Sequence, residues 1–197
     1  MQARAETEKR ASIGARRNPA TEDAILEAAE ALLREGDLAG FSIEAVARRA
    51  RAGKPTIYRW WPNKTRLLLD VYQRLKLKME AVDTGAIEDD CVQFLLGLFR
   101  YWSAGPGQVF RSIFAEAQSD EAAAEALRDY ATGRRAHTAK MFERAIARGE
   151  LRADANAEIA AEMIAAFAWA RLLTGRLQAE EAELRAMVRQ LLGGMRA

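Results

Sequence analysis

The sequence predicts an all-α protein of about nine helices, in which a small N-terminal helical unit precedes a larger helical domain. Alanine, leucine, arginine and glutamate dominate the composition and favour helices, whereas the β-branched residues that favour strands are sparse. Along most of the 197 residues, apolar side chains recur three and four positions apart, which is the spacing of one helix face. Half of the residues are apolar, so the chain can bury a hydrophobic core.

The composition also narrows the class of protein. The chain has one cysteine, Cys91, which excludes an intramolecular disulfide and favours a reducing compartment. No apolar run reaches the roughly 18 residues of a membrane span, and no apolar stretch follows the basic N-terminus as it would in a secretory signal. We therefore expect a cytoplasmic protein with no membrane partner.

An enzyme is one class of protein to consider, and the sequence argues against it. With one histidine, His137, and one cysteine, a metal site of the usual His/Cys kind is nearly excluded, and a Ser-His-Asp triad would have to use His137. The chain has no G-x-S-x-G, P-loop or dinucleotide-binding motif. We expect no catalytic residues, no metal and no cofactor.

Charge is distributed unevenly along the chain. Residues 1–80 hold 16 Lys and Arg against 11 Asp and Glu, a net charge of +5, whereas residues 81–197 hold 14 against 17, a net charge of −3. A basic front part favours contact with a polyanion. Residues 1–18 are charged and aperiodic, and we expect them to form a flexible basic arm. Two roles stay open for its arginines: entry into a minor groove of DNA, or a solvated tail.

The first two helices are predicted from their caps and apolar faces. The first begins at Asn18-Pro19 or at Thr21, runs through apolar residues at helical spacing and ends at Gly36. Ser42 is a suitable N-cap for the second helix, because its hydroxyl can accept from a free backbone N–H. The inner face of that helix consists of Ile43, Val46, Ala47 and Ala50.

The segment GKPTIYRWWPNK, residues 53–64, predicts a third helix of about six or seven residues. Pro55 prevents this helix from beginning earlier, and Pro62 ends it at about Trp61. A helix of this length is unstable alone in water, so it must pack against its neighbours.

The two faces of this short helix differ in chemistry. Ile57 and Trp61 point inward, whereas a hydroxyl, a phenol, a guanidinium and a proline point outward. Such an outward face suits DNA, because hydroxyl groups donate to phosphate oxygens and arginine reads guanine edges or pairs with phosphate. Lys64 begins a fourth helix, which Asn63 caps and which runs to about Ala81. Its charge and the free backbone N–H groups beside it favour a phosphate contact.

These features together predict a helix-turn-helix DNA-binding domain over residues 19–82. The residues FSIEAVARRARAGKPTIYRWWPNKTRLLLDVY resemble the DNA-binding domain of the tetracycline-repressor (TetR) family of bacterial transcriptional regulators. The resemblance covers about residues 20–75 and includes a T-x-Y pair and a P-x-K step. It implies a homodimer on a roughly palindromic double-stranded DNA operator, with the short helix in the major groove.

The resemblance also implies which residues contact DNA. The phosphate-contacting positions of the family correspond to Thr56, Tyr58 and Lys64. The base-contacting positions correspond to Glu44, Lys54 and Pro55. Beside them, the expected interface includes Ser42, Arg59 and Trp60.

Arg51 occupies the turn where the family usually has glycine, at a position that needs a positive φ. A non-glycine residue in that conformation costs on the order of 1 kcal/mol. Two arrangements are open: the turn differs here and Gly53 takes the unusual conformation, or Arg51 takes it and reaches toward DNA.

The remaining residues, 83–197, predict five further helices at about 87–103, 107–117, 120–148, 156–174 and 180–193. By the resemblance they form a regulatory and dimerisation domain. A small-molecule effector bound among its helices would shift the protein between arrangements with high and low affinity for the operator. We expect a repressor that its effector releases from DNA. An activator is the open alternative, because that choice depends on where the operator lies relative to a promoter.

Two sets of mostly apolar side chains are candidates, one for the ligand pocket and one for the dimer interface. The candidate ligand pocket consists of Phe94, Trp102, Phe110, Phe114, His137, Met141, Phe167 and Trp169, each of which also fits an ordinary core or surface position. The last two helices have faces that suit a four-helix interface between two subunits, or packing within one subunit. The candidate interface residues are Ile159, Met163, Phe167, Leu184, Met187, Val188 and Leu191.

A helical sensor or adaptor that binds a protein partner through its short helix is the second alternative class. The basic front part and the position of Lys64 at a helix N-terminus favour DNA over a protein partner.

Overall fold

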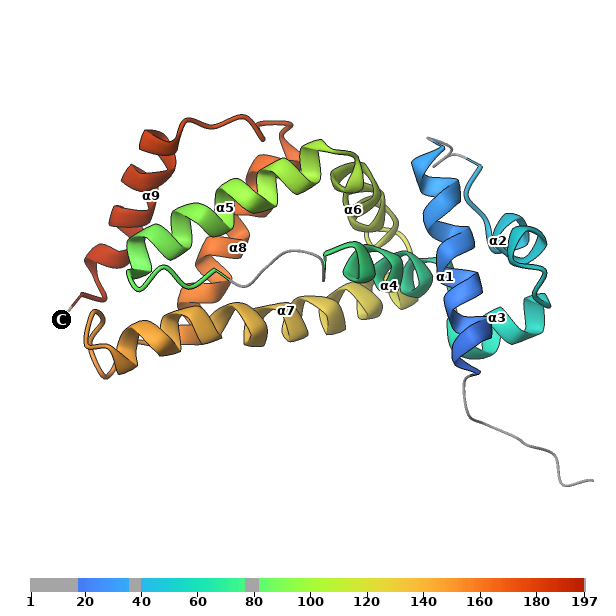
Figure 1. Ribbon diagram of the computed structural model, residues 1–197, viewed down its shortest axis with the longest axis horizontal. Helices are drawn as coiled ribbons and strands as arrows, with labels where there is room; N and C mark the ends of the chain where they lie inside the picture. Colours follow the sequence, from blue (N-terminus) through green and yellow to red (C-terminus); the bar gives the residue numbers. More distant parts are fainter. Residues whose placement is uncertain (1–17, 36–39, 77–81, 197) are drawn as a thin grey trace, which may run out of the picture.

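The computed structural model describes residues 18–35, 40–76 and 82–196, and in these ranges it confirms an all-α architecture (Figure 1). The only β-type pairing in those ranges is an isolated bridge between Leu151 and Arg196. The described helices are α1 (Pro19–Arg34), α2 (Ile43–Ala50), α3 (Lys54–Trp60), α4 (Lys64–Lys76), α5 (Ile87–Ser103), α6 (Pro106–Glu116), α7 (Glu121–Ala147), α8 (Ala157–Leu173) and α9 (Glu181–Gly193).

The predicted caps of the first helices are confirmed. The side chain of Asn18 accepts from the N–H of Ala20 at 3.1 Å and starts α1, and the hydroxyl of Ser42 accepts from the N–H of Ala45 at 3.1 Å and starts α2. These side chains satisfy backbone donors that have no partner inside the helix. Asn18 is therefore the N-cap that directly precedes the first helix.

The start of α3 differs from the prediction by one residue. The helix begins at Lys54, so Pro55 is its second residue and not its first. Proline fits there because the first N–H groups of a helix have no acceptor within it, so the missing N–H removes no hydrogen bond. The carbonyl of Gly53 accepts from the N–H groups of Thr56 and Ile57 at 2.9 and 3.3 Å.

Several sequence predictions fall on residues outside the described ranges. Residues 1–17 of the predicted arm, the predicted helix end at Gly36 and the predicted continuation of the fourth helix to Ala81 belong to this group. Among the described helices, none is long and apolar enough to cross a membrane.

Helix α4 belongs to both parts of the molecule. It packs against α1 at one end of the protein and also against α6 and α7 of the larger bundle, in which α7 packs on α8 and α5 on α9 (Figure 1). Its apolar residues Leu67, Leu68, Val71 and Tyr72 are buried. A shift of α4 relative to the bundle would therefore move α1 and the helices α2 and α3 that pack with it.

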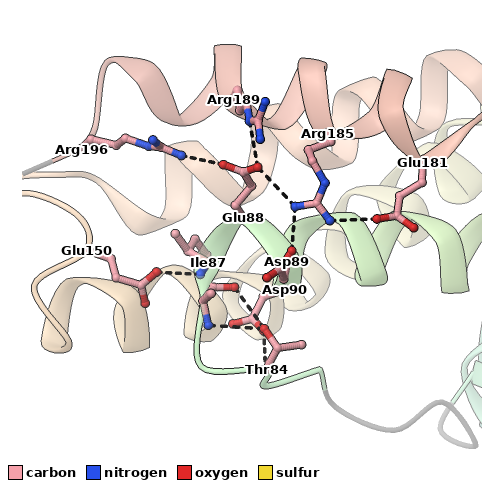
Figure 2. A network of polar contacts seen from close by, with 11 residues as sticks. Thr84, Ile87, Glu88, Asp89, Asp90, Glu150, Glu181, Arg185, Arg189 and Arg196 are labelled. Atoms are coloured by element: carbon pink, nitrogen blue, oxygen red, sulfur yellow. Dashed lines mark hydrogen bonds and ion pairs between the residues drawn. The ribbon is translucent and has the colours of Figure 1, made fainter.

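A network of ion pairs ties the last helix to the start of α5 (Figure 2). The carboxylate of Glu88 accepts from Arg185 at 3.2 Å, from Arg189 at 2.9 Å and from Arg196 at 2.7 Å. Arg185 also donates to Asp89 at 2.7 Å. Because α5 lines the cavity described below, this network fixes one wall of it against α9.

Candidate nucleic-acid interface and ligand cavity

The short helix α3 has the inward and outward faces that the sequence predicts. Ile57 and Trp61 are buried, and the indole N–H of Trp61 donates to the carboxylate of Asp70 on α4 at 2.7 Å. Burial and this hydrogen bond to α4 hold a seven-residue helix in place that would not persist alone.

The outward face of α3 is polar and accessible. Tyr58 is 47% exposed, and Lys54, Pro55 and Arg59 are also exposed. Thr56 and Trp60 are half-buried. The guanidinium of Arg59 lies 5.7 Å from the centre of the Trp60 ring, a cation–π contact that orients both side chains.

Two of the predicted base-contacting residues form an ion pair. The Nζ atom of Lys54 lies 2.9 Å from the carboxylate of Glu44, and both side chains are about half exposed. The hydrogen bond from Lys54 and the charge of that lysine lower the pKa of Glu44. Glu44 therefore stays ionised, positions the Lys54 ammonium at the start of α3 and offsets part of its charge.

The backbone of the turn decides between the two arrangements that the sequence leaves open. Arg51 is the residue in the left-handed conformation, with φ 53° and ψ 35°, whereas Gly53 has an ordinary φ of −70°. Arg51 is the C-cap of α2, and the following N–H of Ala52 donates to the carbonyl of Ala47 at 3.0 Å. The strained residue is thus an exposed arginine in the turn that precedes α3.

Lys64 lies at the first turn of α4, next to α3, and interacts with the larger bundle. Its Nζ atom is 3.2 Å from the carboxylate of Glu116 on α6. Two residues further on, Arg66 pairs with Asp129 on α7. Asn63 caps this end of α4 as predicted, because its side chain accepts from the N–H of Arg66 at 2.8 Å. The N-terminal turn of α4 is therefore connected to the helices of the bundle by ion pairs as well as by packing.

A cavity of about 360 Å³ lies among α4, α5, α7 and α8. Its size is at the lower end of the range for small-molecule sites. It is lined by Tyr72, Phe94, Leu98, Trp102, Arg128, Tyr130, Ala131, Thr132, Arg134, Arg135, Thr138, Glu162, Ala165, Ala166 and Trp169.

The predicted pocket residues divide into two groups. Phe94, Trp102 and Trp169 line the cavity, whereas Phe110, Phe114, His137, Met141 and Phe167 do not, so the prediction is corrected for these five. Phe110 is buried and stacks on the Tyr72 ring, with 4.6 Å between ring centres, so it belongs to the core.

The other four side chains have different surroundings. Phe114 packs edge-on against Trp169, and Met141 is buried in the core. His137 is exposed on α7, and the ring of Phe167 lies 5.6 Å from the Arg171 guanidinium. An apolar helical position therefore does not indicate which neighbours surround the side chain.

Sequence reasoning missed the polar cluster at the cavity. Tyr130, Arg134 and Thr138 lie four residues apart on α7, a spacing that places them on one helix face and was visible in the sequence. The indole N–H of Trp102 donates to the Tyr72 hydroxyl at 2.7 Å. Burial raises the pKa of Tyr72 to about 12, so its hydroxyl remains protonated at neutral pH.

The candidate interface residues also divide. Ile159 and Met163 on α8 are 57% and 50% exposed, and Phe167, Met187 and Leu191 are half-buried. Leu184 and Val188 are fully buried within the subunit, because α9 packs against α5 and α8, so the prediction that they face a second subunit is wrong.

The α2–α3 pair with its polar outward face, next to a helix that also reaches a cavity of the larger bundle, is the architecture of a helix-turn-helix regulator of transcription. Residues 25–71 match the family model described as bacterial regulatory proteins, tetR family, and residues 81–191 match the tetracyclin repressor-like C-terminal domain. The chain belongs to the TetR family, whose members are DNA-binding transcriptional regulators.

Individual relatives agree with this assignment. An uncharacterized HTH-type transcriptional regulator of Bacillus subtilis, YdeS, is 30% identical over 93% of this chain and 94% of its own length. A DNA-binding transcriptional repressor, TetR, of Mycobacteroides abscessus is 30% identical over 75% of this chain and 79% of its own length. The crystal structure of the TetR family regulator SCO0332 is 28% identical, with a TM-score of 0.73 over 90% of this chain and 98% of that one.

Proposed function

We propose that this regulator is a homodimeric repressor that binds a roughly palindromic operator through α3 and is released by a small molecule in the cavity. The observation that carries the proposal is the course of α4. Its first residue, Lys64, lies beside α3, and Tyr72 of the same helix lines the cavity. A ligand that contacts Tyr72 therefore contacts the helix that positions the DNA-binding face.

The contacts of α4 support such coupling. Asp70 of α4 accepts from Trp61 at the end of α3, so a displacement of α4 pulls directly on the short helix. At the same end of α4, Lys64 and Arg66 pair with carboxylates of α6 and α7. A ligand that favours one placement of α4 against α6 and α7 would thereby change the spacing of two α3 helices in a dimer.

The proposed DNA contacts follow from the exposed face. Thr56, Tyr58 and Lys64 would contact phosphates, whereas Lys54, Pro55 and Glu44 would lie at base edges in the major groove. Ser42, Arg59 and Trp60 border this face. The Ser42 hydroxyl accepts the capping hydrogen bond of α2, and its proton remains able to donate to a phosphate oxygen.

The proposed dimer uses the exposed apolar side chains of α8. Ile159, Met163 and Leu173 are each at least half exposed, which is unusual for large apolar residues on one helix. Regulators of this family form dimers. A two-fold interface along α8 would cover these residues, and two symmetry-related α3 helices would match a palindromic operator.

A regulator that acts on bacterial DNA works in the cytoplasm.

The repressor assignment draws on a relative. The Mycobacteroides abscessus protein, at 30% identity, carries the name of a transcriptional repressor. The proposal transfers that property to this chain.

The test is fluorescence-anisotropy titration of the full-length protein with DNA from beside its own gene, against a scrambled duplex, over a salt series. We expect tight, sequence-selective binding that weakens steeply with salt, because phosphate contacts release counterions. Equal and weak binding to both duplexes would contradict an operator beside the gene. Absence of binding at low salt would contradict DNA binding and favour a protein-binding adaptor.

A further inference from the structure

The charges that line the cavity do not balance. Three arginines line it, and Glu162 is the one lining carboxylate among the residues that the structure describes. Arg128 donates to Glu121 at 2.7 Å, and Arg135 lies 3.3 Å from Glu162. Two of the three arginines are therefore already paired with carboxylates.

Arg134 is the remaining lining cation. Within residues 18–35, 40–76 and 82–196 it forms neither a hydrogen bond nor an ion pair. Its side chain is half-buried, so water solvates it only in part. A half-buried guanidinium without an acceptor is unfavourable, and an anion in the cavity would supply that acceptor.

The surroundings of Arg134 support this assignment. The hydroxyls of the buried Tyr72 and the half-buried Tyr130 lie near it, and its positive charge opposes the increase in pKa that burial causes in both. These tyrosines line the same cavity. The polar side of the cavity therefore offers a cation and hydroxyl groups, a set that stabilises negative charge.

Much of the remaining lining of the cavity is apolar. Phe94, Leu98, Trp102, Ala165 and Trp169 line it. A volume of about 360 Å³ corresponds to roughly a dozen water-sized volumes of about 30 Å³ each. The apolar part of a ligand would thus be a small ring system or a medium-length alkyl chain.

We infer that the cavity binds a small amphipathic monocarboxylate, with its aromatic or alkyl body against the apolar wall and its carboxylate on Arg134. One uncompensated guanidinium matches a single negative charge, and its planar fork suits the two oxygens of a carboxylate. A phosphate dianion would leave a charge unpaired, and a cationic ligand would be repelled by Arg134. The binding site stands on the cavity alone, whereas its role as the effector site rests on the proposed function.

The experiment is isothermal titration calorimetry of the full-length protein with two matched series of compounds. One series is 2-naphthoate, 2-naphthamide and 2-naphthylmethylamine, and the other is decanoate, decanamide and decylamine. Within each series the body is constant and the charge changes. We expect at least one carboxylate to bind about tenfold or more tightly than its amide, since a charged hydrogen bond to arginine is lost in the amide.

Variants assign the preference to Arg134. Arg134→Gln should abolish the difference between carboxylate and amide, and Arg134→Lys should retain part of it because the positive charge remains. Lys140→Gln is the matched control on the same helix, since Lys140 is exposed and is not among the residues that line the cavity, and it should change carboxylate affinity by no more than about twofold.

Three results would overturn the inference: neither carboxylate binds, an amide or amine binds more tightly than its carboxylate, or Arg134→Gln keeps the full preference. The proposed function is judged separately by operator binding. A protein that binds its operator but no carboxylate keeps its role as a regulator and loses this ligand class. A protein that binds the carboxylate without any change in operator affinity keeps the site and loses ligand control.

Discussion

Lys64, at the start of α4, and Glu116, on α6, form an ion pair with 3.2 Å between Nζ and the carboxylate oxygen. Lys64 is a proposed phosphate contact, whereas Glu116 belongs to the larger bundle that surrounds the cavity. The same ammonium cannot fully neutralise both a carboxylate and a phosphate. The bundle would therefore compete with DNA for one of the charges on which the proposed binding depends.

Glu116→Gln should tighten operator binding by up to about fivefold, because a partly exposed ion pair contributes at most about 1 kcal/mol. Anisotropy titrations at low and physiological salt would measure this change. The matched control is Glu121→Gln, which removes the same charge from an exposed residue paired with Arg128 on α7. If both variants tighten binding equally, net charge and not release of Lys64 is the cause.

Lys64→Ala should weaken binding to the operator and to a scrambled duplex by a similar factor. Because one phosphate contact is lost, the slope of log K against log salt should decrease in magnitude by about 0.9. Lys54→Ala should instead change the affinity ratio of the two duplexes, since Lys54 is proposed to lie at base edges. Lys140→Ala, at an exposed position on α7, is the control of equal charge. An unchanged salt slope in Lys64→Ala would contradict the proposed docking.

Arg51→Gly should raise the free energy of unfolding by about 0.5–1 kcal/mol, because glycine adopts the left-handed conformation without the strain that a side chain imposes. Urea unfolding would measure it. Arg48→Gly, in the last turn of α2, is the control and should instead destabilise by about 1 kcal/mol. Loss of operator affinity in a stabilised Arg51→Gly protein would show that the arginine contacts DNA, whereas destabilisation would contradict strain at this residue.

Gly107→Ala should destabilise the protein by about 1–3 kcal/mol through overpacking. A Cβ atom at this position would lie 2.7 Å from the carbonyl oxygen of Trp102 and 3.0 Å from a methyl carbon of Leu172. Gly133→Ala is the opposite control: its Cβ would meet no atom within 4 Å, and alanine favours a helix, so stability should rise by roughly 0.5–1 kcal/mol. Equal melting temperatures of the two variants would refute the close approach of α6 to Trp102.

Stability should fall as the pH rises from about 10 to about 12, in part through Tyr72. Burial raises the pKa of Tyr72 to about 12 in the folded protein, whereas the unfolded chain releases the same proton near the ordinary value of about 10. The contribution is complete below pH 10 and is lost as the pH approaches the folded pKa. Tyr72→Phe should reduce the alkaline loss of unfolding free energy relative to the matched control Tyr58→Phe, which removes a phenol at an exposed position. Equal alkaline losses in all three proteins would contradict the burial of this phenol.

Much of the local structure is determined by the sequence alone. The side chains of Asn18, Ser42 and Asn63 cap the helices that the sequence assigns to them, because a cap involves a backbone group only two or three residues away. The inward face of α3 follows in the same way from helical spacing. The motif that identifies the family lies within this local part of the chain.

Only the tertiary structure decided which surfaces meet. Tyr72 of α4 reaches the same cavity as Arg134 of α7, although 62 positions separate them in the sequence. Likewise, Leu184 and Val188 have the spacing of an interface, yet α5 and α8 of the same subunit bury them. Periodicity states that a helix face is apolar, whereas the packing of distant helices determines whether a core, a ligand or a second subunit covers it.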